Sequence, residues 1–198
     1  MGLYCFVSGG AVFRLLTVLL AFGFSITGTA QPALKNHSFK DSRGRSIQLH
    51  DIKGHYLFVS FIYTRCPVAE MCPLTMTLNK QLFKAWKNNA ISIPLKFLIV
   101  TLDPANDPPP TLKAFEEKFG LDSNAFLLVT GEDQAISDFA SEFNALGFPS
   151  NGLISHNSRS ILLSPELVPL KDYKENEWKP EAVLKDLIDF HSKQQKKS

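Results

Sequence analysis

A chain of 198 residues, 44% of them hydrophobic, is long enough for one domain with a substantial core. Its 21 Lys and Arg residues nearly balance its 19 Asp and Glu residues, which leaves a formal net charge of +2. This balance excludes the strongly basic surface that nucleic-acid binding needs, so we expect no nucleic-acid partner.

Residues 1–30 differ in composition from the rest of the chain. They contain one basic residue, Arg14, and no acidic residue, and an apolar stretch over residues 15–26 is followed by small residues that end at Ala30. This order predicts a secretory signal peptide over residues 1–30, with an uncleaved anchor as the alternative. We therefore expect an exported protein, either periplasmic or membrane-anchored and facing the periplasm. An uncleaved N-terminal segment would be its only membrane contact.

Strand and helix patterns alternate along residues 31–192, after a turn predicted at residues 41–44. The predicted strands cover residues 46–49, 56–63, 96–102, 125–129, 160–163 and 167–170. The predicted helices cover residues 73–88, 111–119 and 132–146, and a last helix begins at Pro180. Loops are predicted over residues 104–110 and 148–155, and residues 193–198 form a polar, basic tail.

This order predicts an α/β fold with one domain over residues 31–192. Strands that alternate with helices favour a mainly parallel central sheet with helices on both faces. A closing antiparallel hairpin and a terminal helix complete a thioredoxin-like arrangement. In such sheets, functional side chains gather at the carboxyl ends of the strands.

Two cysteines follow the second predicted strand. Cys66 and Cys72 are the only cysteines after residue 30, and five residues separate them. Two thiols at a strand-to-helix turn can cycle between dithiol and disulfide, or can bind a soft metal ion. Because Cys72 precedes the helix that Pro73 opens, we expect the helix N-terminus to lower the pKa of Cys72.

A third ligand would favour the metal. Cys, Cys and His together suit Cu(I), and His156 lies in a Gly-, Ser- and Asn-rich loop that a thioredoxin-like sheet would bring near the cysteines. The remaining histidines are predicted to be surface residues: His37, His50, His55 and His191.

Several segments together resemble the Sco/SenC family, whose members are copper-binding, thioredoxin-fold proteins involved in cytochrome c oxidase assembly. The matching segments are residues 39–44, 49–54, 61–67, 72–73, 100–108 and 161–165, together with His156. The resemblance implies that Cys66, Cys72 and His156 bind copper, as Cu(I) or Cu(II), and that a cytochrome oxidase subunit receives it. The family usually has three residues between the cysteines, where this chain has five.

The leading interpretation is a copper chaperone with a Cys66, Cys72 and His156 site. The alternative is a thiol–disulfide oxidoreductase in which Cys66 and Cys72 are catalytic, reducing a partner's cysteines with a thioredoxin-like reductant behind it. A peroxidase is disfavoured because no proline precedes the cysteines at the usual place. A binding domain with a structural disulfide is disfavoured because so short a loop gains little stability from the bridge. Arg65 and Asp103 are expected to be solvated or capping residues.

Overall fold

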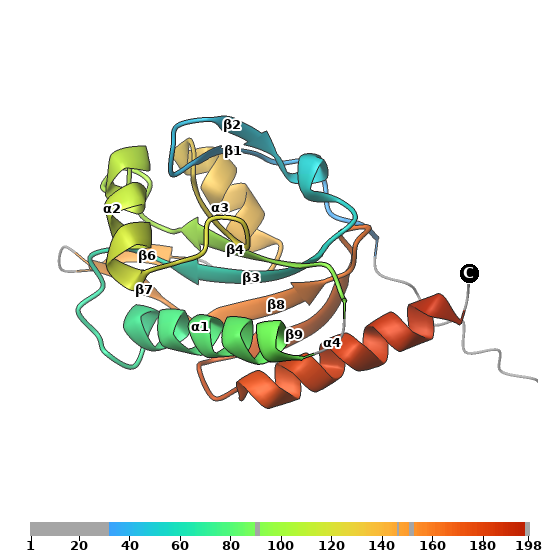
Figure 1. Ribbon diagram of the computed structural model, residues 1–198. Coiled ribbons are helices and arrows are strands. Elements are labelled where there is room, and N and C mark those ends of the chain that lie inside the picture. The colour runs from blue at the N-terminus through green and yellow to red at the C-terminus, as the bar shows by residue number, and fades with distance from the viewer. Residues whose placement is uncertain (1–31, 90–91, 146, 151–152, 197–198) are drawn as a thin grey trace, which may run out of the picture. The chain divides into compact units, whose positions relative to one another are not determined.

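The computed structural model describes residues 32–89, 92–145, 147–150 and 153–196 (Figure 1). The strands are β1 (Ser38–Asp41), β2 (Ser46–Gln48), β3 (Tyr56–Ile62), β4 (Leu95–Thr101), β5 (Phe126–Thr130), β6 (Gly147–Ser150), β7 (Leu153–His156), β8 (Arg159–Leu163) and β9 (Pro169–Lys174). The helices are α1 (Cys72–Asn88), α2 (Pro109–Phe119), α3 (Asp133–Ser141) and α4 (Pro180–Gln195), with a short 3-10 helix at Leu49–Ile52.

Seven strands form one mixed sheet in the order β2-β1-β5-β4-β3-β8-β9. β3, β4 and β5 are parallel, and β1, β2, β8 and β9 join them in antiparallel pairs. The predicted α/β, thioredoxin-like fold, with a closing hairpin and helices on both faces, is confirmed. The sheet is mixed rather than mainly parallel, because only the central pairs β3–β4 and β4–β5 are parallel. β6 and β7 form a separate two-stranded sheet that the sequence did not predict.

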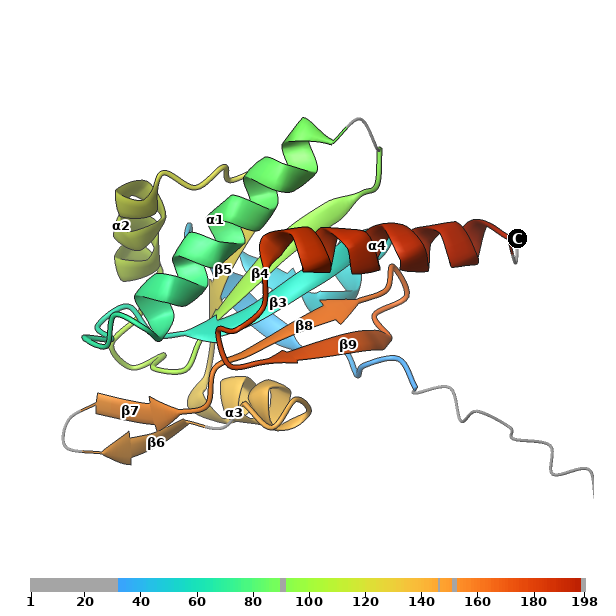
Figure 2. The same cartoon turned by 90° about the horizontal axis from the view of Figure 1, so that it is seen from below.

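Apolar side chains of the central strands point alternately to the two faces of the sheet, which explains why helices cover both faces. Phe58 and Ile62 of β3 pack in one buried cluster with α1, α2 and α4, whereas Leu57 and Val59 pack in a second cluster with α3. Successive side chains of a strand point to opposite faces, so a strand that is apolar throughout must be covered twice. Figure 2 shows α1 and α4 on one face of the sheet and α3 on the other.

Two predicted boundaries are wrong for reasons of backbone conformation. The helix expected over residues 132–146 ends at Ser141, because Asn144 has a φ of 53° and turns the chain out of the helix. The last strand is β9, Pro169–Lys174, rather than residues 167–170, because Leu167 lies in the hairpin turn with a φ of 65°.

The predicted signal peptide over residues 1–30 lies outside the described residues. Among the helices of the described part, none is both long enough and apolar enough to span a membrane.

The aromatic stack in the first cluster provides a test of the core. Phe97 is fully buried and stacks on Phe126 with ring centroids 4.6 Å apart. We expect Phe97→Ala to lower the free energy of unfolding by about 3–5 kcal/mol, because the deletion leaves a cavity. Urea denaturation measures this loss. Phe148→Ala is the matched control, because Phe148 is 62% exposed and its truncation should change stability little. Equal losses in the two variants would contradict this description of the core.

Candidate thiol and metal site

The two cysteines lie at the carboxyl edge of the parallel strands. β3 ends at Ile62, and an irregular segment carries Cys66 before α1 begins at Cys72. Pro73 occupies the first turn of α1, where its missing N–H breaks no helical hydrogen bond. Both thiols are free; Cys66 is half-buried and Cys72 is buried.

The expectation that the helix N-terminus lowers the pKa of Cys72 is wrong. Only 2% of Cys72 is exposed, and burial raises the pKa of its thiol because the charged thiolate loses its hydration. A hydrogen bond with the neighbouring Cys66 sulfur raises it further. Cys72 is therefore protonated near neutral pH when no metal ion is bound.

The pKa of Cys66 shifts in the opposite direction. Burial alone would raise the pKa of Cys66, but hydrogen bonds from the backbone N–H groups of Cys72 and Val68, and from the Cys72 and Tyr63 side chains, outweigh it. The pKa of Cys66 is therefore lower than that of an ordinary thiol. One thiol of the pair is thus the accessible, more easily ionised one, and the other is its buried partner.

His156 is placed beside Cys72, although 84 residues separate them in the sequence. Its Nε2 atom lies 3.6 Å from Cys72 Sγ, and its Nδ1 atom donates a hydrogen bond to the Asn157 carbonyl at 3.0 Å. Because a carbonyl oxygen only accepts, the proton is on Nδ1 and the lone pair of Nε2 faces the thiol. Burial lowers the pKa of His156, which keeps the imidazole neutral near pH 7.

The segment that carries His156 is a hairpin, not the predicted loop. β6 pairs with β7 so that Gly147 lies opposite His156. A Cβ atom on Gly147 would come within 2.6 Å of the Ile154 side chain, so only glycine allows the two strands this approach. The Gly-, Ser- and Asn-rich composition favoured a loop, but the chain pairs as a hairpin in which Gly147 allows the close approach opposite His156.

Tyr63 is a site residue that sequence reasoning missed. Its ring packs edge-on against His156 with centroids 5.8 Å apart, and the residue is buried. Burial, followed by hydrogen bonding with the Cys66 side chain, raises the pKa of Tyr63 to about 12. Its position at the end of a continuous apolar strand marked it only as a core residue. Its distance of three residues from Cys66 was the one available signal.

Asp103 was expected to be a solvated or capping residue, and its burial rules out the solvated role. It accepts a hydrogen bond from the Arg65 guanidinium at 2.7 Å, and 6% of the residue is exposed. Arg65 directly precedes Cys66, and Asp103 follows β4. The ion pair therefore ties the cysteine segment to the neighbouring loop.

Two of the three candidate ligands, Cys72 and His156, have donor atoms and a spacing that suit a soft metal ion. A metal about 2.3 Å from a thiolate sulfur and about 2.0 Å from an imidazole nitrogen separates the two ligands by about 3.5 Å at a tetrahedral angle and by about 3.7 Å at the trigonal angle of a three-ligand site. Cys72 Sγ and His156 Nε2 are 3.6 Å apart. Among the described residues, no three His, Cys, Asp or Glu side chains are already arranged to hold a metal ion.

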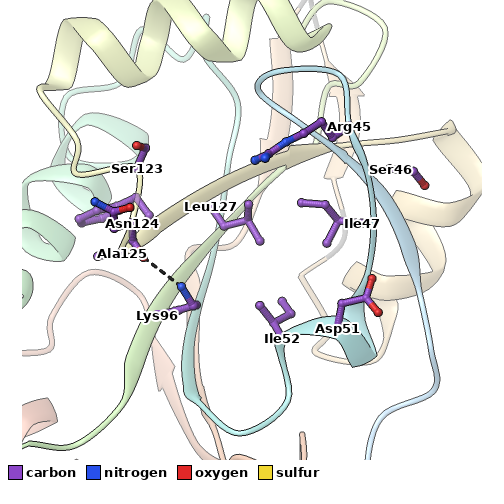
Figure 3. Close-up of a pocket in the computed structure, with 11 residues that line it drawn as sticks. Arg45, Ser46, Ile47, Asp51, Ile52, Lys96, Ser123, Asn124, Ala125 and Leu127 are labelled. Carbon is purple, nitrogen blue, oxygen red and sulfur yellow. Dashed lines mark hydrogen bonds between the residues drawn. The ribbon is translucent and has the colours of Figure 1, made fainter.

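A hollow of about 380 Å³ lies away from this site, at the amino ends of the parallel strands (Figure 3). Its lining includes Ile47, Ile52, Leu127, Arg45 and Lys96. Arg45 is paired with Asp41 at 2.6 Å, and Lys96 donates to the Asn124 carbonyl at 3.0 Å. Both cations are already engaged within the protein, and none of the three candidate ligands lines the hollow.

Comparison with known proteins identifies the family. The SCO1/SenC family model matches residues 27–191. The SCO1 protein homolog of Bacillus subtilis strain 168 is 30% identical over 140 residues, which are 69% of this chain and 70% of the relative.

Two solved structures have the same fold. BsSco, a member of the Sco family of cytochrome c oxidase assembly proteins in which a disulfide switch was identified, is 27% identical with a TM-score of 0.69. The likeness covers 80% of this chain and 93% of BsSco. Arabidopsis thaliana ScoI with copper bound is 18% identical with a TM-score of 0.69, and the likeness covers 84% of this chain and 100% of ScoI. At that identity, the second likeness shows the fold alone.

The asymmetry of the thiols predicts their order of alkylation. In the reduced protein we expect iodoacetamide to modify Cys66 first, because a lowered pKa maintains thiolate at lower pH and Cys66 is accessible. Cys72 should react only after unfolding, because its pKa is raised and it is buried. Mass spectrometry of Cys66→Ser and Cys72→Ser across pH 6–9 measures both rates. Faster reaction at Cys72 in the folded protein would contradict this assignment.

Proposed function

This chain belongs to the SCO1/SenC family, and we propose that it binds Cu(I) through Cys66, Cys72 and His156 and delivers it to a cytochrome c oxidase subunit. Copper is the cargo in this proposal, so the site has to release the ion as well as hold it. The observation that carries the proposal is the 3.6 Å separation of Cys72 Sγ and the free Nε2 atom of His156.

The chemistry of the three side chains supports this assignment. Cu(I) is a soft ion that accepts low coordination numbers and prefers sulfur and imidazole ligands. His156 is neutral and oriented by its hydrogen bond to Asn157, an arrangement typical of metal-bound histidine. Two thiolates and a neutral imidazole would hold Cu(I) without any hard oxygen ligand.

The unequal exposure of the thiols supports a route for transfer. Cys66 is half-buried in an exposed segment, whereas Cys72 is buried at the start of α1. A ligand from the partner would replace Cys66 first, while Cys72 and His156 still hold the ion. The ion stays Cu(I) throughout, because each step exchanges one ligand for another.

The relatives agree with both parts of the proposal. Arabidopsis thaliana ScoI contains copper, and BsSco is an assembly protein of cytochrome c oxidase. The composition of residues 1–30 supports export, which would place the site on the same side of the membrane as a periplasmic oxidase domain.

A second function is favoured by one observation, the presence of two free thiols in the segment from the end of β3 to the start of α1. Cys66 and Cys72 would reduce a disulfide in a partner protein. Each thiol gives up one proton and one electron, the Cys66–Cys72 bond forms, the partner's S–S bond breaks, and its two sulfurs become thiols. A thioredoxin-like dithiol would then restore the reduced pair by the same exchange.

Cu(I) titration of the reduced protein under anaerobic conditions, against a chromophoric chelator, tests the primary function. We expect one Cu(I) per chain, with affinity reduced more than about tenfold in His156→Ala, since even outer hydrogen-bond partners of a ligand typically contribute that much. Binding should be lost in the Cys66→Ser, Cys72→Ser double variant.

His191→Ala is the matched control, because His191 packs against Tyr56 at the opposite end of β3. An unchanged affinity in His156→Ala, or the same loss in His191→Ala, would remove His156 from the site. Absence of Cu(I) binding by the folded, reduced protein would leave the dithiol reaction as the function.

A further inference from the structure

The backbone just before Cys66 is hydrogen-bonded to the buried carboxylate of Asp107, which belongs to a different loop. Asp107 follows β4 and is fully buried. It accepts the backbone N–H of Thr64 at 3.0 Å, and the hydroxyls of Thr64 and Thr101 also donate to it. A buried carboxylate needs such donors, and hydrogen bonds to a charged acceptor are the stronger ones. Thr64 is therefore fixed two residues before Cys66.

The support that holds Thr64 is itself rigid. Asp103, which pairs with Arg65, accepts the Asn106 side-chain amide at 2.8 Å, and its backbone N–H donates to Thr101 at 3.0 Å. The backbone N–H of Asp107 donates to the Asp103 carbonyl at 2.9 Å. The loop after β4 thus forms a closed hydrogen-bond network against the cysteine segment.

The other end of the segment is held by one amide. Asn176, between β9 and α4, donates from Nδ2 to the carbonyl oxygens of Glu70 and Met71, both at 3.0 Å. Its Oδ1 atom accepts the Thr75 hydroxyl at 3.0 Å. Glu70 and Met71 directly precede Cys72, so Asn176 fixes the entry to α1.

Between these two attachments the chain is exposed over residues 67–70. Among the described residues, the backbone of this stretch forms hydrogen bonds within the segment, with the N–H of Leu74 in the first turn of α1, and with Asn176. Five residues between two sulfurs would sample many separations if the ends were free, because each unfixed residue retains conformational entropy. Fixing both ends removes most of that freedom while leaving the exposed middle able to adjust.

We propose that Asp107 and Asn176 are positioning residues for the thiol pair, holding the two ends of the Cys66–Cys72 segment so that both sulfurs reach one bonding partner. The positioning of the thiols for copper binding rests on the proposed function, whereas their positioning for disulfide formation does not. The five-residue spacing is then compatible with a tight site, because attachments from the loops after β4 and β9 replace the restraint that a shorter spacing would supply.

The test uses Asp107→Ala, Asp107→Asn and Asn176→Ala in the full chain, with controls of the same type elsewhere. Glu116→Ala removes a buried carboxylate that accepts the Ser42 hydroxyl at 2.6 Å. Asn36→Ala removes an amide that accepts the backbone N–H of His50 at 3.0 Å. Three quantities are measured: the free energy of unfolding, the Cu(I) affinity, and the equilibrium constant for oxidation by glutathione disulfide.

In that oxidation the Cys66–Cys72 bond forms, the glutathione S–S bond breaks, and two thiol protons pass to two glutathione thiols. We expect Asp107→Ala and Asn176→Ala to lower this constant about tenfold, which makes the reduction potential about 30 mV less negative. Cu(I) affinity should fall about tenfold as well. Asp107→Asn, which retains a carbonyl acceptor, should show a smaller loss, and the controls should lower stability alone.

The proposal is overturned if the Asp107 and Asn176 variants lose stability while both constants stay within about twofold of the unmodified protein, or if the controls shift the constants equally. If Asp107→Ala does not fold, Asp107→Asn and Asn176→Ala decide the question. A shifted glutathione constant in a protein that never binds Cu(I) would support the positioning role and reject the copper function.

Discussion

The antiparallel register between β3 and β8 determines whether the candidate site exists. Ser60 lies opposite Ser160, and their hydroxyls are 2.9 Å apart. Because the strands run in opposite directions, the chain after Ser60 and the chain before Ser160 reach the same edge of the sheet. That edge receives Cys66 and Cys72 from one strand and His156 from the other. A slip of two residues would displace His156 by about 7 Å and separate it from the thiols.

The parallel register of β3 and β4 is the second requirement for the candidate site. β3 and β4 are in register to their last residues, with Ile62 opposite Thr101, so the loops that follow them leave the sheet together. Loops at the carboxyl ends of parallel strands are where α/β proteins place their functional groups. Here the loop after β4 contributes no ligand. It contributes the carboxylates of Asp103 and Asp107, which hold the segment that carries Cys66.

The thiols have different environments, and that difference organises the proposed chemistry. Cys72 is buried beside a neutral imidazole, whereas Cys66 is half-buried and surrounded by hydrogen-bond donors. A symmetric, fully buried pair would bind an ion tightly and release it slowly. One buried and one accessible sulfur allow either a ligand exchange or a disulfide exchange to begin at Cys66, with Cys72 as the group that completes it.

Much of the fold could be predicted because the central strands are continuously apolar and the helices repeat with a period of 3.6. The thiol pair and His156 could be named because their residue types are rare and chemically specific. The hairpin of β6 and β7 could not, since it depends on a close approach at Gly147 that resembles a loop in sequence. The opposite pKa directions of the two thiols depend on burial, and the roles of Tyr63 and Asn176 depend on contacts between distant segments.

X-ray absorption spectroscopy at the copper edge of the Cu(I)-loaded protein tests the central claim most directly. We expect a coordination shell of two sulfur atoms and one imidazole nitrogen, with the nitrogen contribution missing in His156→Ala. A shell of sulfur atoms only, or an unchanged nitrogen contribution in His156→Ala, would contradict the assignment of Cys66, Cys72 and His156 as one site.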